Sequence, residues 1–426
     1  MKKYDSYKDS GIEWLGEIPS HWEVNRLGIW FKERREKVSD KVFEPLSVTK
    51  NGVVPQLESA AKSNDGDNRK LVKKGDFVIN SRSDRKGSSG LSYLDGSVSL
   101  INIVLQPIKV NGNYVNYLLK SNSFIEEFYR NGHGIVADLW TTRYEDMKFI
   151  GLGIPPIKEQ QVIATFLDDK CGQIDKAIEI KEKQIGLLKE QRQIIIHNAV
   201  TKGIDKNVKL KDSGVDWIGD IPEHWEVKRL RYLGITQNGL SKGGEFFGKG
   251  TPFVNYSDVY KNFTLPTFVN GLVDVSEDEI VQYSVKKGDI FFTRTSETVE
   301  EIGISSVALE SYNKTTFAGF LIRFRPNSRV FLPMFSKYFF RSEINRFYFI
   351  GNMNIVIRAS LSQELLKGLP ILLPSLQEQQ QIVDYLDEHI TKIDKSVAIK
   401  EQQIEKLKEY KQSLINEVVT GKVRVS

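Results

Sequence analysis

The chain of 426 residues carries 60 lysines and arginines against 55 aspartates and glutamates, a formal net charge of +5. No apolar run approaches the roughly 18 residues of a membrane-spanning helix. The single cysteine, Cys171, excludes an internal disulfide and a cysteine-rich zinc site, and the opening MKKYDSYKDSG lacks the apolar core of a secretory signal. We therefore expect a protein of the reducing cytoplasm without membrane attachment. The mild positive charge permits nucleic-acid binding without requiring it.

The sequence contains one unit written twice. GIEWLGEIPSHWEV begins at Gly11 and GVDWIGDIPEHWEV begins at Gly214, an offset of 203 residues. VKKGDFVINSRS at Val72 and VKKGDIFFTRTS at Val285 follow at an offset of 213, and from Pro107 onward the offset stays at 219. Two copies with so long a period indicate a duplication instead of a solenoid, and they predict a molecule with a pseudo-twofold axis.

Each copy ends in a segment with the apolar period of a long helix. In the first copy the spacing alternates between 4 and 3 residues through Leu167, Cys171, Ile174, Ile178, Lys181, Ile185, Leu188, Arg192, Ile195 and Ala199. The same stripe recurs 219 residues later, with its two basic interruptions at the equivalent positions, Lys400 and Lys411. The pattern stops at Gly203 and Gly421.

A stripe this narrow predicts a coiled-coil seam of about four heptads in helices about 60 Å long. Because a twofold axis between the halves would relate the two helices, we expect them to pair antiparallel. The alternative is two unrelated helices, each packed on its own domain.

The globular part of each copy predicts short strands mixed with short helices. KGDFVINS and KGDIFFTR are typical of a Gly-Asp turn before a strand, and SLINIVLQP and FAGFLIRFRP of strands closed by proline. SNSFIEEFYRNG and SEINRFYFIGN predict helices with serine at the N-cap. We therefore predict an α+β fold with similar globular domains at 1–153 and 204–372, separated by long helices at 154–203 and 373–426.

The sequence contains few signatures of catalysis. It has no phosphate-binding loop and no HExxH, CxxC or GxSxG motif. The repeated segments 11–24 and 214–227, here called the Trp-His segments, contain His21 and His224 without nearby metal ligands, so we assign both histidines to packing or hydrogen bonding. The second Trp-His segment follows the helix end at Gly203, and we predict that each segment fastens a globular domain to the coiled coil.

Three basic loops rich in glycine or hydroxyl side chains are the other signal. They are INSRSDRKGSSG (79–90), NGLSKGGEFFGKG (238–250) and FTRTSET around Arg294. Arginine, lysine, serine and asparagine donate hydrogen bonds to phosphates and base edges, but solvated surface loops have a similar composition. Two domains on a rigid spacer would suit two half-sites on a DNA duplex, which favours nucleic-acid contact.

Taken together, these motifs resemble the specificity subunit of type I restriction-modification enzymes. The resemblance rests on the two Trp-His segments, on KKGDFVINS with KKGDIFFTR, and on the two helix starts P-x₃-EQQ at Pro155 and Pro374. It covers essentially the whole chain, with both halves in order.

The resemblance implies two target recognition domains that read the two halves of a bipartite, gapped, asymmetric DNA site. Such a subunit would not be an enzyme. It would recruit two methylation subunits that use S-adenosylmethionine, and restriction motor-nuclease subunits that use ATP, and would hold no cofactor or metal of its own.

We nominate residues from the basic loops for contact with double-stranded DNA: Ser81, Arg82, Arg85, Lys86, Lys242, Lys249, Asn255, Tyr256, Arg294 and Ser296. The long helices and the Trp-His segments should dock the methylation subunits, and we expect partner contacts on the polar faces of the helices, at Gln160, Lys183, Gln379 and Gln402.

Two other classes of function remain open on the sequence alone. A coiled-coil scaffold that joins two protein-binding modules would show no salt-dependent affinity for DNA. A modification enzyme whose site assembles in space would transfer methyl groups as a purified single chain.

Overall fold

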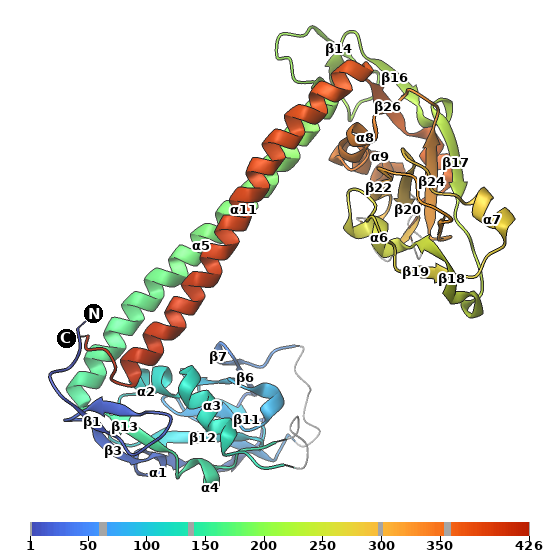
Figure 1. Ribbon diagram of the computed structural model, residues 1–426. Helices are drawn as coiled ribbons and strands as arrows, with labels where there is room; N and C mark the ends of the chain where they lie inside the picture. The colour runs from blue at the N-terminus through green and yellow to red at the C-terminus, as the bar shows by residue number, and fades with distance from the viewer. Residues whose placement is uncertain (1, 59–65, 135–139, 297–300, 353–358, 426) are drawn as a thin grey trace. The chain divides into compact units, whose positions relative to one another are not determined.

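The computed structural model (Figure 1) describes residues 2–58, 66–134, 140–296, 301–352 and 359–425. The chain divides into two compact units, Met1–Glu182 with Glu401–Ser426 and Lys183–Lys400. Each unit contains one globular domain and one half of each long helix. No helix in the described ranges is long and apolar enough to span a membrane.

The globular domain of the first unit is built on a four-stranded antiparallel sheet in the order β10-β9-β12-β4. The strands are β1 (Tyr7–Asp9), β2 (Glu17–Pro19), β3 (Glu23–Arg26), β4 (Phe31–Glu33), β5 (Lys37–Val38), β6 (Leu46–Thr49), β7 (Gly52–Pro55), β8 (Arg69–Val72), β9 (Phe77–Asn80), β10 (Ser89–Leu91), β11 (Gly96–Val98), β12 (Asn102–Pro107) and β13 (Gly151–Ile154). The short helices are α1 (Leu27–Trp30), η1 (Ser83–Arg85), α2 (Gly112–Leu119), α3 (Asn122–Arg130) and α4 (Tyr144–Met147).

The second unit repeats this plan with the sheet β22-β20-β24-β17. Its strands are β14 (Leu210–Asp212), β15 (Asp220–Pro222), β16 (Glu226–Arg229), β17 (Gly234–Asn238), β18 (Phe247–Val254), β19 (Gly271–Val273), β20 (Ile290–Thr293), β21 (Thr295–Ser296), β22 (Ser305–Val307), β23 (Thr316–Phe317), β24 (Leu321–Pro326), β25 (Ala359–Ser360) and β26 (Pro370–Leu373). Its short helices are η3 (Leu230–Tyr232), η4 (Gly244–Phe246), α6 (Tyr256–Lys261), α7 (Glu277–Gln282), α8 (Pro333–Phe339), α9 (Glu343–Asn352) and α10 (Gln363–Gly368).

The two domains share a framework and differ at its edge. Both carry a two-stranded ribbon from the Trp-His segment to the strand before the long helix, β3 with β13 and β16 with β26. Their smaller three-stranded sheets differ, since β11-β8-β5 is antiparallel throughout whereas β18 pairs parallel with β23. The framework is therefore repeated and the outer sheet is not.

The repeated KKGD sequences form the turns that the motif predicts. Asp76 and Asp289 are buried, and each carboxylate accepts the backbone N–H of the first lysine of its motif, at 2.8 and 2.7 Å. Each aspartate also pairs with an arginine, Asp76 with Arg34 at 2.7 Å and Asp289 with Arg325 at 2.6 Å. Breaking such a buried pair typically costs about 3 to 5 kcal/mol, which explains why the aspartate occurs in both copies.

The two long helices are α5 (Ile157–Lys202) and α11 (Leu376–Val419). Within each unit they run side by side in opposite directions (Figure 1). Many apolar residues of the predicted seam are buried, among them Leu167, Cys171, Ile185, Leu386, Ile390 and Ile404. The prediction of an α+β fold with two similar domains joined by long helices that form an antiparallel coiled coil is therefore confirmed.

The basic interruptions of the seam each find an acceptor on the facing helix. In the first unit Lys181 donates to Gln403 and Lys411 to Asp175, both at 2.7 Å. In the second unit Lys400 donates to Gln184 at 2.7 Å, and Arg192 lies 3.4 Å from Asp394. These four polar contacts between the helices favour a single register of the seam, as polar residues do in other coiled coils.

The Trp-His segments fasten each domain to the start of a long helix, as predicted. Glu159, in the first turn of α5, accepts hydrogen bonds from Trp22 Nε1 at 3.2 Å and from His21 Nε2 at 2.7 Å. Glu378, in the first turn of α11, accepts the same two bonds from Trp225 at 3.2 Å and from His224 at 2.6 Å. The assignment of both histidines to hydrogen bonding is confirmed.

The end of the facing helix completes each junction. Gly421 after α11 has a φ of +74°, and a side chain there would lie 2.3 Å from the ring of Pro19. Gly203 after α5 has a φ of +72° and approaches Trp225. Only glycine combines the backbone conformation and the close approach at Gly421, whereas at Gly203 the left-handed conformation alone favours glycine. Each tryptophan is therefore enclosed between the start of one helix and the end of the other.

The two carboxylates are completed in different ways. Ser375 and Glu378 form a capping box, in which the Ser375 N–H donates to Glu378 at 3.1 Å and the Glu378 N–H donates to the serine hydroxyl at 3.2 Å. The equivalent of Ser375 in the first copy is Pro156, which has no N–H to donate, and there the Tyr4 hydroxyl donates to Glu159 at 2.7 Å. Both carboxylates thus receive a third donor.

Replacing Glu378 by glutamine should weaken the second junction. A neutral amide cannot accept from His224, Trp225 and Ser375 at once, so we expect the free energy of unfolding to fall by about 2 kcal/mol. Urea unfolding followed by tryptophan fluorescence measures this change. Gln377→Ala, an exposed neighbour on the same turn, is the control and should change stability by less than about 0.5 kcal/mol.

The effect of Glu378→Gln should depend on pH. Burial favours the protonated carboxyl, but the hydrogen bonds from His224, Trp225 and Ser375 outweigh it and hold the pKa of Glu378 below its ordinary 4.5. The stabilisation by this carboxylate is then fully present above pH 4.5 and is lost as the pH falls through the lowered value. The difference between the variant and the unchanged chain should shrink at the acid end, and a constant difference would contradict this account.

Candidate nucleic-acid interface

The first basic loop leaves the central sheet at the end of β9 and returns in β10. Arg82, Arg85 and Lys86 are exposed on it. Arg85 lies 3.6 Å from Asp84 and Lys86 donates to Glu126 at 2.6 Å, whereas Arg82 has no acidic partner in the described part of the chain. These three cations lie on the surface of the first domain, as the sequence predicts for DNA contact.

Ser81 is less exposed than these cations and lines the groove described below. It is buried, and its hydroxyl donates to the carbonyl oxygen of Ile101 at 2.6 Å. The hydroxyl fastens the end of β9 to the chain just before β12, and contact of Ser81 with DNA stays a prediction.

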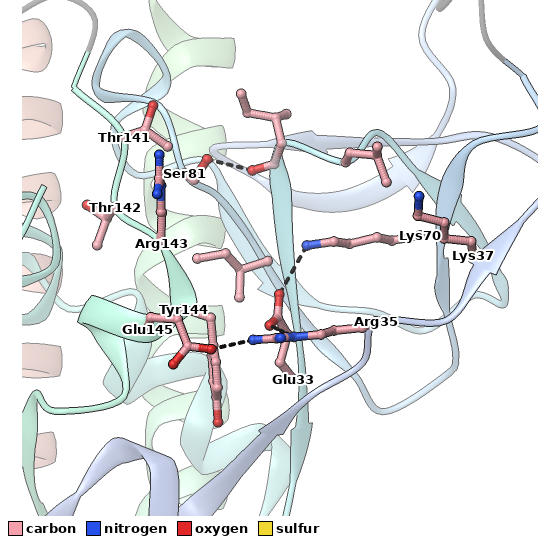
Figure 2. Close-up of a pocket in the computed structure, with 13 residues that line it drawn as sticks. Glu33, Arg35, Lys37, Lys70, Ser81, Thr141, Thr142, Arg143, Tyr144 and Glu145 are labelled. Atoms are coloured by element: carbon pink, nitrogen blue, oxygen red, sulfur yellow. Dashed lines mark hydrogen bonds and ion pairs between the residues drawn. The ribbon is translucent and has the colours of Figure 1, made fainter. Parts of the chain in front are cut away.

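A groove of about 620 Å³ opens next to this loop (Figure 2). Its charged and aromatic lining comes from Glu33, Arg35, Lys37, Lys70, Arg143, Tyr144 and Glu145. The loop borders the groove directly. The backbone of Arg82 forms an antiparallel β-bridge with Thr141, and Thr142 donates its N–H to the Ser81 carbonyl at 3.0 Å.

Positive charge exceeds negative charge in the lining of the groove. Arg35 lies between Glu33 and Glu145, at 2.5 Å from each, and Lys70 also pairs with Glu33, at 3.1 Å (Figure 2). Among the residues that the structure describes, the side chain of Arg143 has no carboxylate partner. Four cations against two carboxylates leave a surface that attracts anions.

The predicted DNA-contact residues of the second domain differ in how exposed they are and in what they contact. Lys249 is exposed and lies 3.5 Å from Asp274, while Lys242 is held by Glu279 at 2.8 Å and covers the ring of Phe246 at 4.9 Å. Gly250, with a φ of +89°, leaves no room for a side chain against the Val273 carbonyl, so the glycine shapes this loop.

Three further nominations lie near α6 and the end of β20. Asn255 caps α6 by accepting the Asp258 N–H at 3.1 Å, so its side chain has a structural task. The ring of Tyr256 stacks on Tyr260 at 5.8 Å. Arg294 is half-buried and lies 3.5 Å from the Gly319 carbonyl.

The backbone of Ser296 pairs with Ala359, and its side chain lies outside the described part of the structure. Contact of these residues with DNA stays a prediction.

Of the four residues predicted to contact partner subunits, two are buried and two are exposed. Gln160 and Gln379 are 1% and 0% exposed, so neither lies on the polar face of its helix as expected. Gln160 accepts the Asn111 N–H and donates to the Pro155 carbonyl, both at 2.8 Å, and Gln379 makes the equivalent bonds with Leu332 and Pro374. They fasten the globular domain to the helix start, which corrects that expectation.

Lys183 and Gln402 are exposed on the two helices, where a partner protein could contact them. Their role stays a prediction. Within the described residues no three His, Cys, Asp or Glu side chains gather as a metal site would require.

The cations of the groove were not apparent from the sequence. Arg35, Lys37, Lys70 and Arg143 come from segments that lie far apart in the chain, and none belongs to a glycine-rich basic run. Arg35 and Lys37 belong to the basic stretch KERREK at 32–37, but an exposed strand at the edge of a sheet would have a similar composition.

Comparisons with known proteins agree with this architecture. Residues 222–409 match the family model of the type I restriction modification DNA specificity domain. The chain is 26% identical to the type I restriction enzyme MjaVIII specificity subunit of Methanocaldococcus jannaschii, over 96% of this chain and 94% of that protein. It is 27% identical to the EcoKI specificity subunit of Escherichia coli K12, over 66% of this chain and 59% of that protein.

Solved structures show the same fold at low sequence identity. A chain from a study of complex assembly and conformational transition in a type I restriction-modification system matches with a TM-score of 0.70 and 15% identity, over 95% of this chain and 99% of that one. The HsdS subunit from Thermoanaerobacter tengcongensis matches with a TM-score of 0.54 and 16% identity, over 95% and 98%. These findings confirm the resemblance: the second half of the chain matches the type I restriction modification DNA specificity domain, and the relatives that align with it are specificity subunits, the non-catalytic components of type I restriction-modification systems.

Proposed function

We propose that this specificity subunit reads a bipartite, gapped and asymmetric DNA site, with one recognition domain on each half-site. The long helices would set the distance between the half-sites. Because the long helices pair antiparallel, we infer that the half-sites are read on opposite strands, about one helical turn apart.

The observation that carries the proposal is the division between repeated and unrepeated residues. The junctions, the KKGD turns and the buried glutamines recur in both units with the same contacts. The loop after β9 carries Arg85 and Lys86, which the sequence RTSETVEE after β20 does not repeat, and the outer sheets differ in strand direction. A common framework with different surfaces suits two domains that do the same task on different sequences.

The charges of the first domain support contact with phosphate groups. Arg82 and Arg143 flank the groove without carboxylate partners among the described residues, so pairing with a phosphate would displace no existing ion pair. Cations of this kind position a protein on the duplex, and side chains from the neighbouring loop would then read base edges.

The chemistry would lie in partner subunits. We propose that two methylation subunits, carrying S-adenosylmethionine, dock on the long helices and the junctions, and that restriction subunits supply the ATP-driven steps. The exposed residues Lys183 and Gln402 are candidate contacts on the helices. The target base would be flipped into a methylation subunit while this chain holds the duplex.

The complex of this chain with its methylation subunits should bind duplex DNA in a strongly salt-dependent way. Each phosphate contact releases counterions, so about six or more contacts would lower the affinity about a thousandfold between 50 and 200 mM salt. Titration of a labelled duplex at several salt concentrations measures the slope. A flat response would instead support a scaffold that joins two protein-binding modules.

Arg82→Ala and Arg143→Ala should each reduce the slope of log affinity against log salt by about one, because each removes one phosphate contact. Lys74→Ala is the matched control, since Lys74 is an exposed cation at the opposite end of β9. If all three variants lower the affinity equally, the effect is one of net charge and the groove is not the contact surface.

A further inference from the structure

The second recognition domain touches the coiled coil at a point beyond the junction. Phe263 follows α6, in the part of the domain that has no counterpart in the shared framework. The guanidinium carbon of Arg192, on α5, lies 5.1 Å from the centre of the Phe263 ring. The guanidinium carbon of Arg341, in the turn between α8 and α9, lies 4.4 Å from the same ring. One aromatic ring thus joins the spacer, the framework and the outer part of the domain.

Each member of this Arg192–Phe263–Arg341 cluster is held by a second contact. Arg192 lies 3.4 Å from Asp394 on the facing helix. Arg341 donates to the Tyr260 carbonyl, at the end of α6, at 2.6 Å. The backbone carbonyl of Phe263 accepts the Val307 N–H from the central sheet at 3.2 Å. The backbone of Phe263 is therefore tied to the sheet, and the two arginines that face its ring are tied to α6 and to the facing helix.

The aromatic ring offsets a repulsion between like charges. Burial, and then the neighbouring charge of Arg192, lower the pKa of Arg341 to about 10. An aromatic face attracts both guanidinium groups, and this attraction is stronger where water is partly excluded. The ring thus gives both guanidinium groups a favourable contact at the place where their charges repel each other.

In the described part of the first unit two corresponding cations occur with no aromatic ring recorded between them. Lys411 is the equivalent of Arg192 and pairs with Asp175 at 2.7 Å. Lys120, in the turn between α2 and α3, donates to the Lys50 carbonyl at 3.1 Å, and its pKa is lowered by burial and then by Lys411. In both units a cation of that turn therefore contacts the outer part of the domain, and among the described residues the contact through an aromatic ring to the spacer occurs in the second unit.

We propose that Phe263 is a positioning residue that sets the angle between the second recognition domain and its spacer helices, so that the recognition domain itself contributes to the permitted gap between half-sites. This inference rests on the proposed function. It implies that the gap is not a property of the coiled coil alone, and that exchanging the outer part of the domain would change the gap together with the sequence read.

The test compares methylation of duplexes that carry both half-sites with the native gap, or with a gap one base pair longer or shorter. The complex of the full chain with its methylation subunits is used throughout. Phe263→Leu keeps an apolar side chain but removes the aromatic face. We expect discrimination between native and altered gaps to fall about tenfold while preference within each half-site is unchanged.

Phe268→Leu is the matched control, because Phe268 lies in the same segment and is 84% exposed. Arg192→Lys provides a second variant that keeps the charge beside Asp394 and loses the planar group over the ring. If Phe263→Leu does not fold, Arg192→Lys decides, and it should also relax the gap. Unchanged gap discrimination in a folded variant would overturn the inference. Failure of the unchanged complex to methylate any gapped site would instead overturn the proposed function.

Discussion

The attachment of each recognition domain depends on one carboxylate in the first turn of a long helix. Glu159 and Glu378 lie where the unpaired N–H groups of the helix start favour negative charge, and each also receives the indole and imidazole of a Trp-His segment. The group that stabilises the helix start is therefore the group that holds the domain. The repeated sequence occurs twice because the chain has two such helix starts to join to a domain.

This arrangement separates the joining of domains from the reading of sequence. The bonds from tryptophan and histidine to the junction carboxylates, the KKGD turns and the buried glutamines are common to both units, while the outer sheets differ. The outer part of a recognition domain can then change without loss of the junction, because none of the contacts of Glu159 or Glu378 comes from it. The Phe263 cluster is the exception, since it connects a variable segment to the spacer, and it would make target sequence and gap partly dependent on each other.

The features that the sequence predicts well are those with a local period or a repeated motif. The seam of α5 and α11 follows a 3–4 spacing, and the KKGD turns and proline-closed strands depend on neighbouring residues. The positions of Gln160, Gln379 and Ser81 were not predictable in this way. The identity of a polar residue does not show whether its side chain is exposed to solvent or buried and hydrogen-bonded to a backbone carbonyl. The groove lined by Arg35 and Arg143 depends on chain segments that meet only after folding.

The most direct test of the central claim is a genome-wide map of methylated adenines in the source cells with and without this gene. Reading by two inverted recognition domains predicts that deletion removes one bipartite, gapped motif, with its methylated adenines on opposite strands, and leaves all other methylation in place. An unchanged map in cells that express the chain and its methylation subunits would contradict the assignment of sequence reading to this protein.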